Sequence, residues 1–119
     1  DAMCQAYERA RSAYFVIESE GVLLGGAGVS PLRDGSPEIC ELQKMYFSPL
    51  ARGKGCGDLM IEHCLTFAQA QQFKKCYIET MPNMQAAQKL YQKKGFEYIE
   101  GPIGNTGHSN CSVWMLKNL

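Results

Sequence analysis

The chain has 119 residues and a mass of 13.2 kDa, the size of a single ordinary domain with its own core. Twelve Lys and Arg balance twelve Asp and Glu. The zero net charge argues against a general nucleic-acid-binding protein, whose affinity rests on excess positive charge. No apolar run approaches the roughly 20 residues that span a bilayer, so we expect no membrane segment.

Hydrophobic periodicity predicts one mixed α/β (α+β) domain over residues 1–119. In chain order the expected elements are a short helix over 1–12, strands over 13–19, 22–29 and 39–47, a helix over 58–72, a strand over 75–80, a helix over 84–94, and strands over 96–100 and 111–116. This order, (α)βββαβαββ, requires a mixed sheet with one parallel crossover.

Local signals refine these boundaries. Glu20 and Gly21 predict a hairpin turn, and the glycines at 25, 26 and 28 predict a bulge or a close approach of another backbone. Gly95 predicts the end of the second long helix as a left-handed cap, with Phe96 packing back on the last turn.

Six cysteines lie far apart in the sequence and lack the dense spacing of a disulfide framework. They are Cys4, Cys40, Cys56, Cys64, Cys76 and Cys111. His63 and His108 do not stand at zinc-ligand spacing from any of them. We therefore expect reduced thiols, no metal site and a cytoplasmic location.

A glycine-rich loop, Arg52-Gly-Lys-Gly-Cys-Gly57, leads directly into the first long helix. Glycines allow tight turns and close ligand approach, and the amides of a helix N-terminus carry a partial positive charge. The segment lacks the GK[ST] ending of a Walker loop and the acidic partner of a dinucleotide-binding fingerprint. On its own the loop therefore predicts either an anion cradle or a merely structural turn.

Two segments in this order and spacing resemble the GNAT family of acetyl-CoA-dependent N-acetyltransferases. They are LQKMYFSPLARGKGCG at 42–57 and AAQKLYQKKGF at 86–96. The resemblance covers roughly residues 13–119 and implies the GNAT fold. The family's usual opening strand and most of its helical pair have no counterpart, and the chain starts at Asp1 rather than Met. We therefore expect a trimmed, N-terminally shortened domain, whose edge a homodimer would cover.

The resemblance implies a coenzyme site. Backbone amides of the loop would bind the coenzyme A diphosphate, and the strand before it would offer main-chain groups to the pantetheine arm. By position the coenzyme-binding residues are Arg52, Gly53, Lys54, Gly55, Cys56 and Gly57 in the loop, Met45, Tyr46 and Phe47 on the strand, and Asn83, Ala87 and Tyr91 around the later helix. The thiol of Cys56 would face the diphosphate and not the thioester.

The resemblance also implies catalytic roles. Amine acetylation needs removal of an ammonium proton, stabilisation of an oxyanion and protonation of a thiolate. Tyr91 matches the family's general acid, Glu41 the position of a base acting through water, and the Met45 amide an oxyanion donor. Each side chain also has a structural interpretation, as a core tyrosine or an ordinary strand carboxylate. Glu79 and the loop residue His108 are weaker candidates on the acceptor side.

In one place the chain departs from the family pattern. Members often carry an Asn seven residues before the tyrosine, where this chain has Met84, and Asn83 is displaced by one residue. Asn83 then serves either as a helix cap or, through a shifted helix start, as the pantetheine contact. Capping is the preferred interpretation. The lysine pairs at 74–75 and 93–94 are interpreted as solvated helix-end charges, one of which could meet the coenzyme's 3′-phosphate.

Together these features predict an N-acetyltransferase that moves an acetyl group from acetyl-CoA to a primary amine of a small molecule or peptide by direct attack. A non-catalytic acyl-CoA-binding module is the alternative. A nucleotide-phosphate binder unrelated to coenzyme A is a third possibility, distinguished by competition from ATP.

Overall fold

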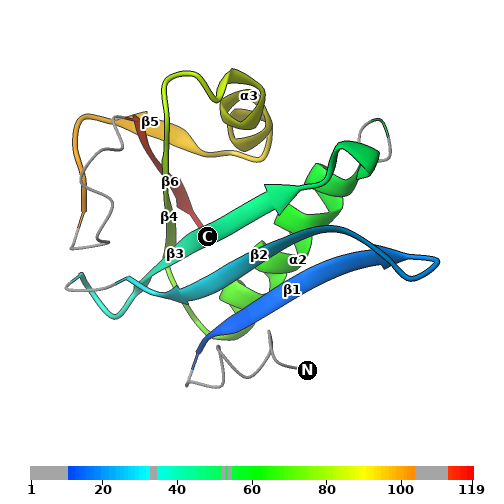
Figure 1. Ribbon diagram of the computed structural model, residues 1–119. Coiled ribbons are helices and arrows are strands. Elements are labelled where there is room, and N and C mark those ends of the chain that lie inside the picture. Colours follow the sequence, from blue (N-terminus) through cyan, green and yellow to red (C-terminus); the bar gives the residue numbers. More distant parts are fainter. Residues whose placement is uncertain (1–10, 33–34, 52, 54, 104–112) are drawn as a thin grey trace.

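The computed structural model describes residues 11–32, 35–51, 53, 55–103 and 113–119, with Lys44 described through its backbone alone. Its six strands form one sheet in the order β1-β2-β3-β4-β6-β5 (Figure 1). The elements are β1 (Ala13–Ser19), β2 (Val22–Pro31), β3 (Ile39–Phe47), the 3-10 turn η1 (Pro49–Ala51), α2 (Cys56–Ala70), β4 (Lys75–Thr80), α3 (Gln85–Lys93), β5 (Glu97–Ile99) and β6 (Val113–Asn118). The predicted element order is confirmed from residue 13 onward. The helix expected over 1–12 lies outside the described residues, apart from Arg11 and Ser12, which are not helical.

The hairpin of β1 and β2 forms as predicted. Glu20 and Gly21 have φ angles of 51° and 80°, the two positive values of a turn that matches strand twist. The glycines of β2 permit close packing, since a Cβ on Gly25 would lie 2.6 Å from Cδ1 of Phe47. A Cβ on Gly26 would lie 2.7 Å from the hydroxyl of Tyr14. A Cβ on Gly25 would also lie 2.8 Å from the Tyr46 carbonyl oxygen, so the predicted close approach of another backbone is confirmed there.

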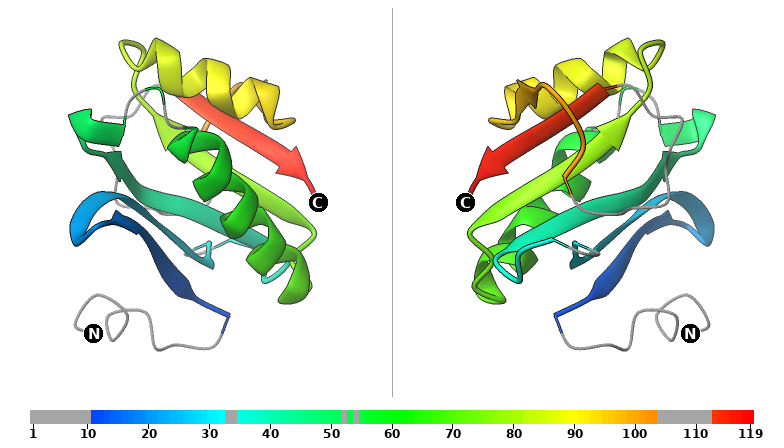
Figure 2. Two further views of the ribbon diagram at one scale, coloured as in Figure 1. Left: turned by 90° about the vertical axis from the view of Figure 1, so that its right-hand side faces the viewer. Right: turned by 90° about the vertical axis from the view of Figure 1, so that its left-hand side faces the viewer.

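Helix α2 covers one face of the sheet (Figure 2). Its apolar positions recur at three- and four-residue spacing and are buried against β1, β2 and β3. Met60, Ile61, Cys64 and Ala68 are each at most 1% exposed. The helix begins two residues earlier than predicted, at Cys56, because Gly55 takes a left-handed conformation with φ 70° immediately before it.

Helix α3 ends as predicted at Gly95, where φ is 98°. The Gly95 amide donates to the Gln92 carbonyl at 3.0 Å, and the Phe96 amide donates to the Tyr91 carbonyl at 3.0 Å. This pair of bonds is the Schellman ending of a helix. Phe96 is 2% exposed, and its ring centroid lies 5.9 Å from that of Tyr91. The cap thus fixes the orientation of the helix turn that carries Tyr91.

The start of α3 differs from the prediction. The N-cap is Met84, with no side-chain capping bond, and Asn83 is an exposed turn residue before it. The capping role expected for Asn83 is therefore wrong. The turn is closed instead by the backbone, with the Met84 amide donating to the Met81 carbonyl at 3.0 Å.

The centre of the sheet splits open. β3 and β4 are parallel but pair only from Ile39–Lys75 to Glu41–Tyr77, whereas β4 pairs with β6 along its whole length. Beyond Glu41, the edge of β3 that faces β4 is therefore not paired with it. On its other side β3 carries a bulge, because two residues, Lys44 and Met45, stand opposite Ala27 of β2. A bulge leaves one residue out of the ladder, and here it lies beside the split.

Candidate active site

A hollow of about 260 Å³ fills the split between β3 and β4, and we call it the wedge. It is lined by residues of β3, of β4 and its following turn, and of α3. Four predicted site residues meet there: Glu41, Met45, Glu79 and Tyr91. The wedge exists because the two strands part after Glu41, so this carboxyl lies at the base of the opening.

Glu41 is a buried carboxyl, with 5% of the residue exposed. Loss of hydration raises its pKa from 4.5 to about 7, and the nearby charge of Glu79 adds to the shift. A carboxyl with a pKa near neutrality exists in both protonation states at physiological pH. It is therefore suited to accept a proton in one step and release it later.

A hydrogen-bonded pair that the sequence analysis did not single out lies beside Glu41. The hydroxyl of Tyr77 donates to Oε2 of Glu79 at 2.6 Å and accepts from the backbone amide of Ile103 at 3.1 Å. Tyr77 is the register partner of Glu41 across the two strands. The signal for this pair was present in the sequence, since residues two apart on a strand share a face. Burial and the Glu79 carboxylate hold the pKa of Tyr77 well above its usual value.

Tyr91 reaches the wedge from α3. It is 5% exposed, and its hydroxyl donates to Sδ of Met45 at 3.5 Å. Burial raises its pKa to about 12, so the hydroxyl keeps its proton throughout the physiological range. Of the neighbouring predicted residues, Ala87 is half-buried against the main core. Met84 lines the wedge, whereas Asn83 is exposed and is not among the residues that line it.

A second hollow of about 320 Å³ surrounds the glycine-rich loop, and we call it the loop pocket. Gly53 and Gly55 have φ angles of 72° and 70°, and a Cβ on either would meet nothing within 4 Å. The first intrahelical bond of α2 runs from the Leu59 amide to the Gly55 carbonyl at 3.1 Å, so the preceding amides of the first turn are left without helical partners. An open, glycine-lined cradle at a helix N-terminus fits a diphosphate. Arg52 and Lys54 lie outside the described residues.

The two hollows adjoin each other. Met45 lines the wedge and Phe47, two residues further along β3, lines the loop pocket. On α3, Tyr91 lines the wedge and Leu90 lines the loop pocket. Tyr46 lies between Met45 and Phe47 on β3 and is 39% exposed. A long ligand can therefore follow β3 from the loop to Glu41.

The thiol of Cys56 does not have the predicted orientation. Cys56 borders the loop pocket but is 7% exposed and packs with Leu24 and Ala51 in a small apolar cluster. The expectation that it faces the diphosphate is therefore wrong, because the first turn of α2 directs this side chain inward. The four described cysteines, Cys40, Cys56, Cys64 and Cys76, are free and buried.

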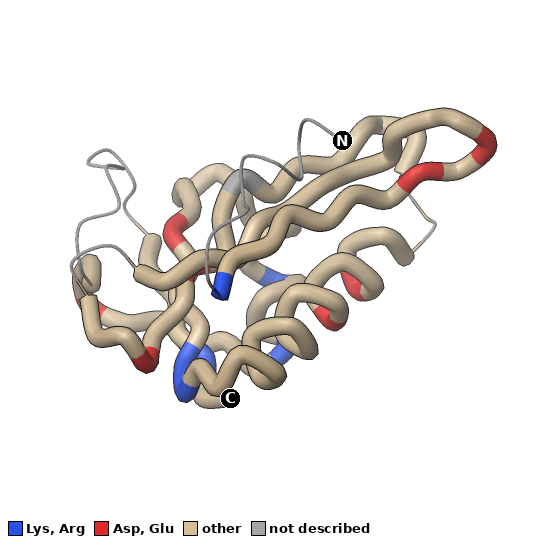
Figure 3. The backbone as a smooth tube through the Cα atoms, turned by 90° about the horizontal axis from the view of Figure 1, so that it is seen from below, with Lys and Arg blue, Asp and Glu red and all other residues tan. Residues whose placement is uncertain are grey.

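Charged residues of both signs are distributed over the described part of the chain. Lys and Arg are interspersed with Asp and Glu over the described backbone, with acidic residues at the tip of the β1–β2 hairpin (Figure 3). No metal-binding cluster occurs among the described residues, and no helix among them is long and apolar enough to cross a membrane. His108 lies outside the described part of the chain.

Comparison with known proteins agrees with this geometry. Residues 1–96 match the model of the acetyltransferase (GNAT) family. An uncharacterized N-acetyltransferase of Escherichia coli, YjgM, is 43% identical over 119 residues, all of this chain and 71% of that protein. The chain therefore belongs to the GNAT family of acetyltransferases.

Solved structures confirm the fold. A GNAT-family acetyltransferase from Staphylococcus aureus superposes with a TM-score of 0.84 at 18% identity, over 97% of this chain and 72% of that one. A phosphinothricin acetyltransferase from Sinorhizobium meliloti, solved in complex with AcCoA, superposes with a TM-score of 0.76 at 20% identity, over 97% of this chain and 65% of that one. At these identities the likeness concerns the fold alone.

Proposed function

We propose that the protein transfers an acetyl group from acetyl-CoA to a primary amine by direct attack. One observation carries the proposal: the wedge holds a buried carboxyl of pKa about 7 and a buried, protonated tyrosine, and it adjoins the glycine-lined loop pocket. That arrangement supplies a proton acceptor, a proton donor and an anion site along one strand.

The coenzyme lies along β3 in this proposal. Amides of Gly53 and Gly55, where a Cβ would meet nothing within 4 Å, and amides of the first turn of α2, which includes Gly57, hold the diphosphate. The edge of β3 from Met45 to Phe47 offers main-chain groups to the pantetheine arm in the manner of an added strand. The thioester then supplies the acetyl group inside the wedge.

The chain's own groups move the protons. Glu41 takes the proton of the incoming ammonium group through a water molecule. The Met45 amide, at the bulge, stabilises the negative charge that develops on the acetyl oxygen. The Tyr91 hydroxyl donates its proton to the departing sulfur. The acetyl–nitrogen bond forms, the acetyl–sulfur bond breaks, and coenzyme A leaves as a thiol. The acylated nitrogen then loses its second proton, which restores the Tyr91 hydroxyl.

The test is the release of free coenzyme A thiol from acetyl-CoA in the presence of a broad panel of amines. We expect at least one amine to accelerate release, and we expect the Glu41→Gln/Tyr91→Phe double variant to lose that acceleration while still binding coenzyme A. Tight binding of acetyl-CoA with no acceleration by any amine would favour the acyl-CoA-binding module. Acetyl-CoA at ten times its Kd should stabilise the fold by about 1.4 kcal/mol; no rise in Tm, or displacement by ATP, would refute the coenzyme site.

A further inference from the structure

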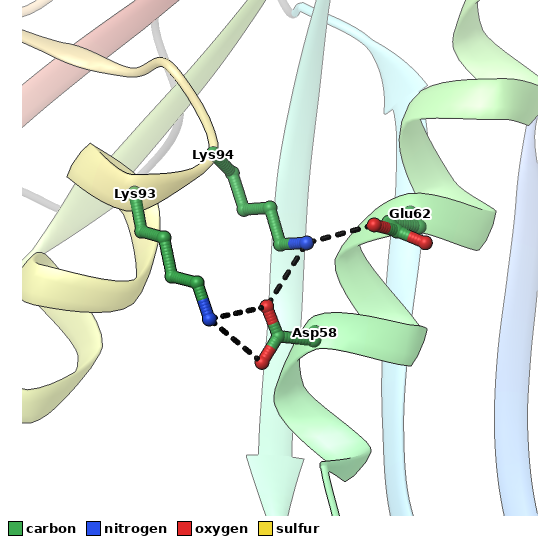
Figure 4. Close-up of polar contacts among 4 residues, drawn as sticks. All are labelled: Asp58, Glu62, Lys93 and Lys94. Carbon is green, nitrogen blue, oxygen red and sulfur yellow. Dashed lines mark hydrogen bonds and ion pairs between the residues drawn. The ribbon is translucent and has the colours of Figure 1, made fainter.

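Four charged side chains connect the start of α2 to the end of α3 (Figure 4). Lys94 Nζ lies 2.9 Å from Oδ1 of Asp58 and 2.8 Å from Oε1 of Glu62. Lys93 Nζ lies 3.2 Å from the same Asp58 oxygen. Both lysines are therefore ion-paired, and only Lys93 is also solvated as the sequence interpretation expects. The two partners are not equivalent, because the Lys94 side chain is 15% exposed and that of Lys93 is 67% exposed.

This cluster borders the loop pocket through one of its carboxylates. Asp58 lines the loop pocket together with Gly53, Gly55 and Gly57. The helices also meet directly, since a Cβ on Gly57 would lie 2.7 Å from Cδ2 of Leu90. The lysines therefore act at the place where the proposed diphosphate cradle borders α3.

Asp58 creates an electrostatic conflict at this position. A carboxylate in the first turn of a helix is favourable for the helix, because it faces the positive end of the dipole. The same carboxylate opposes a second anion in the adjoining pocket. Lys93 and Lys94 hold the pKa of Asp58 below its usual value, so the group stays ionised and its charge must be offset rather than removed. Two lysines against Asp58 and Glu62 make the cluster neutral in formal charge.

We infer that Lys94 is a positioning residue that neutralises Asp58 and thereby lets the α2 N-terminus bind the coenzyme's diphosphate. The inference rests on the proposed coenzyme site. It assigns Lys94 to affinity for the coenzyme and not to the chemical step. Lys93 makes the smaller contribution to this neutralisation, because its side chain is more exposed and, among the described residues, is paired with Asp58 alone.

The test is the Kd of coenzyme A, measured by calorimetry on the full chain. Lys94→Met should weaken binding about two- to fivefold, the range expected for one charge near a helix terminus. Lys94→Arg should bind like the wild type. Lys89→Met, at an exposed lysine of the same helix, is the matched control and should not change Kd. The deficit of Lys94→Met should shrink between low and high salt, because exposed charges are screened.

A double variant separates charge neutralisation from simple bracing of the helices. Asp58→Asn alone should bind coenzyme A at least as tightly as the wild type, and Asp58→Asn/Lys94→Met should recover wild-type affinity. A double variant as weak as Lys94→Met would overturn the inference, as would an unchanged Kd in Lys94→Met. If Lys94→Met fails to fold, weaker binding by Asp58→Asn would overturn it instead. Failure of the wild type to bind coenzyme A would refute the proposed function itself, so the two failures are distinguishable.

Discussion

Replacement of Glu41 by Gln perturbs the buried carboxyl at the base of the wedge while nearly preserving its shape. Glu41 is 5% exposed, and burial is the main cause of its pKa of about 7. Gln cannot accept a proton. We therefore expect opposite effects of this single change on activity and on stability.

Activity should fall strongly. A positioned general base contributes about 10²- to 10⁴-fold to a rate, so we expect kcat to drop at least a hundredfold. In the wild type, log kcat should rise with unit slope at acidic pH and level off above about pH 7, since the base must be ionised. In Glu41→Gln that limb should disappear.

At alkaline pH the Glu41→Gln variant should be more stable than the wild type. The folded pKa of about 7 lies above the unperturbed 4.5, so the native state binds more protons than the unfolded state between these values. The contribution of the protonated Glu41 carboxyl to the stability of the wild type is therefore fully present below pH 4.5 and is lost as pH rises through about 7. The difference of about 2.5 pKa units, at 1.36 kcal/mol each, amounts to about 3 kcal/mol. Gln avoids this cost, so the variant should be more stable by up to about 3 kcal/mol at pH 8.

Urea unfolding at pH 5 and pH 8, combined with thiol-release kinetics over the same range, measures both effects. The stability gap between variant and wild type should open as pH rises. Glu41→Asp is the control that keeps a titrating carboxyl. A variant that loses stability equally at both pH values, or retains the acidic limb of the kcat profile, would refute the reasoning.

Three further predictions concern the same site and the core. Tyr91→Phe should lower kcat about a hundredfold with an unchanged Kd for coenzyme A. The kcat of the wild type should not decline up to about pH 10, because the Tyr91 pKa is about 12. A decline of the wild-type kcat near pH 9 would exclude Tyr91 as the acid. Gly55→Ala, at φ 70°, should cost about 1 kcal/mol in urea unfolding and weaken coenzyme A binding about tenfold. Gly21→Ala, at φ 80° in the hairpin, should cost as much without changing that Kd, and equal binding losses would contradict the cradle. Iodoacetamide should leave the thiols of Cys64 and Cys76 unmodified in the native protein, as read by peptide mass spectrometry, because burial and neighbouring groups raise both thiol pKa values; rapid native labelling of either would contradict that burial.

The sequence by itself determined the elements and their order. Period-two and helical patterns act over neighbouring residues, so they located β1 to β4, both helices and the Gly95 cap to within two residues. The glycine-rich loop could be predicted equally well, because left-handed glycines and a helix start are local features. The GNAT resemblance rested on these same segments, and the family comparison confirms it.

Only the tertiary structure decided the properties of the site. The wedge opens because β4 leaves β3 after three register pairs, which no local pattern specifies. Burial and the nearby Glu79 charge, which raise the Glu41 pKa, arise only when the strands assemble. The contacts of Tyr91 with Met45 and of Lys94 with Glu62 join residues 46 and 32 positions apart. The neutral charge count of the sequence therefore gives no sign of the local arrangement in which Lys93 and Lys94 pair with Asp58 and Glu62 beside the loop pocket, because charge acts through space and not along the chain.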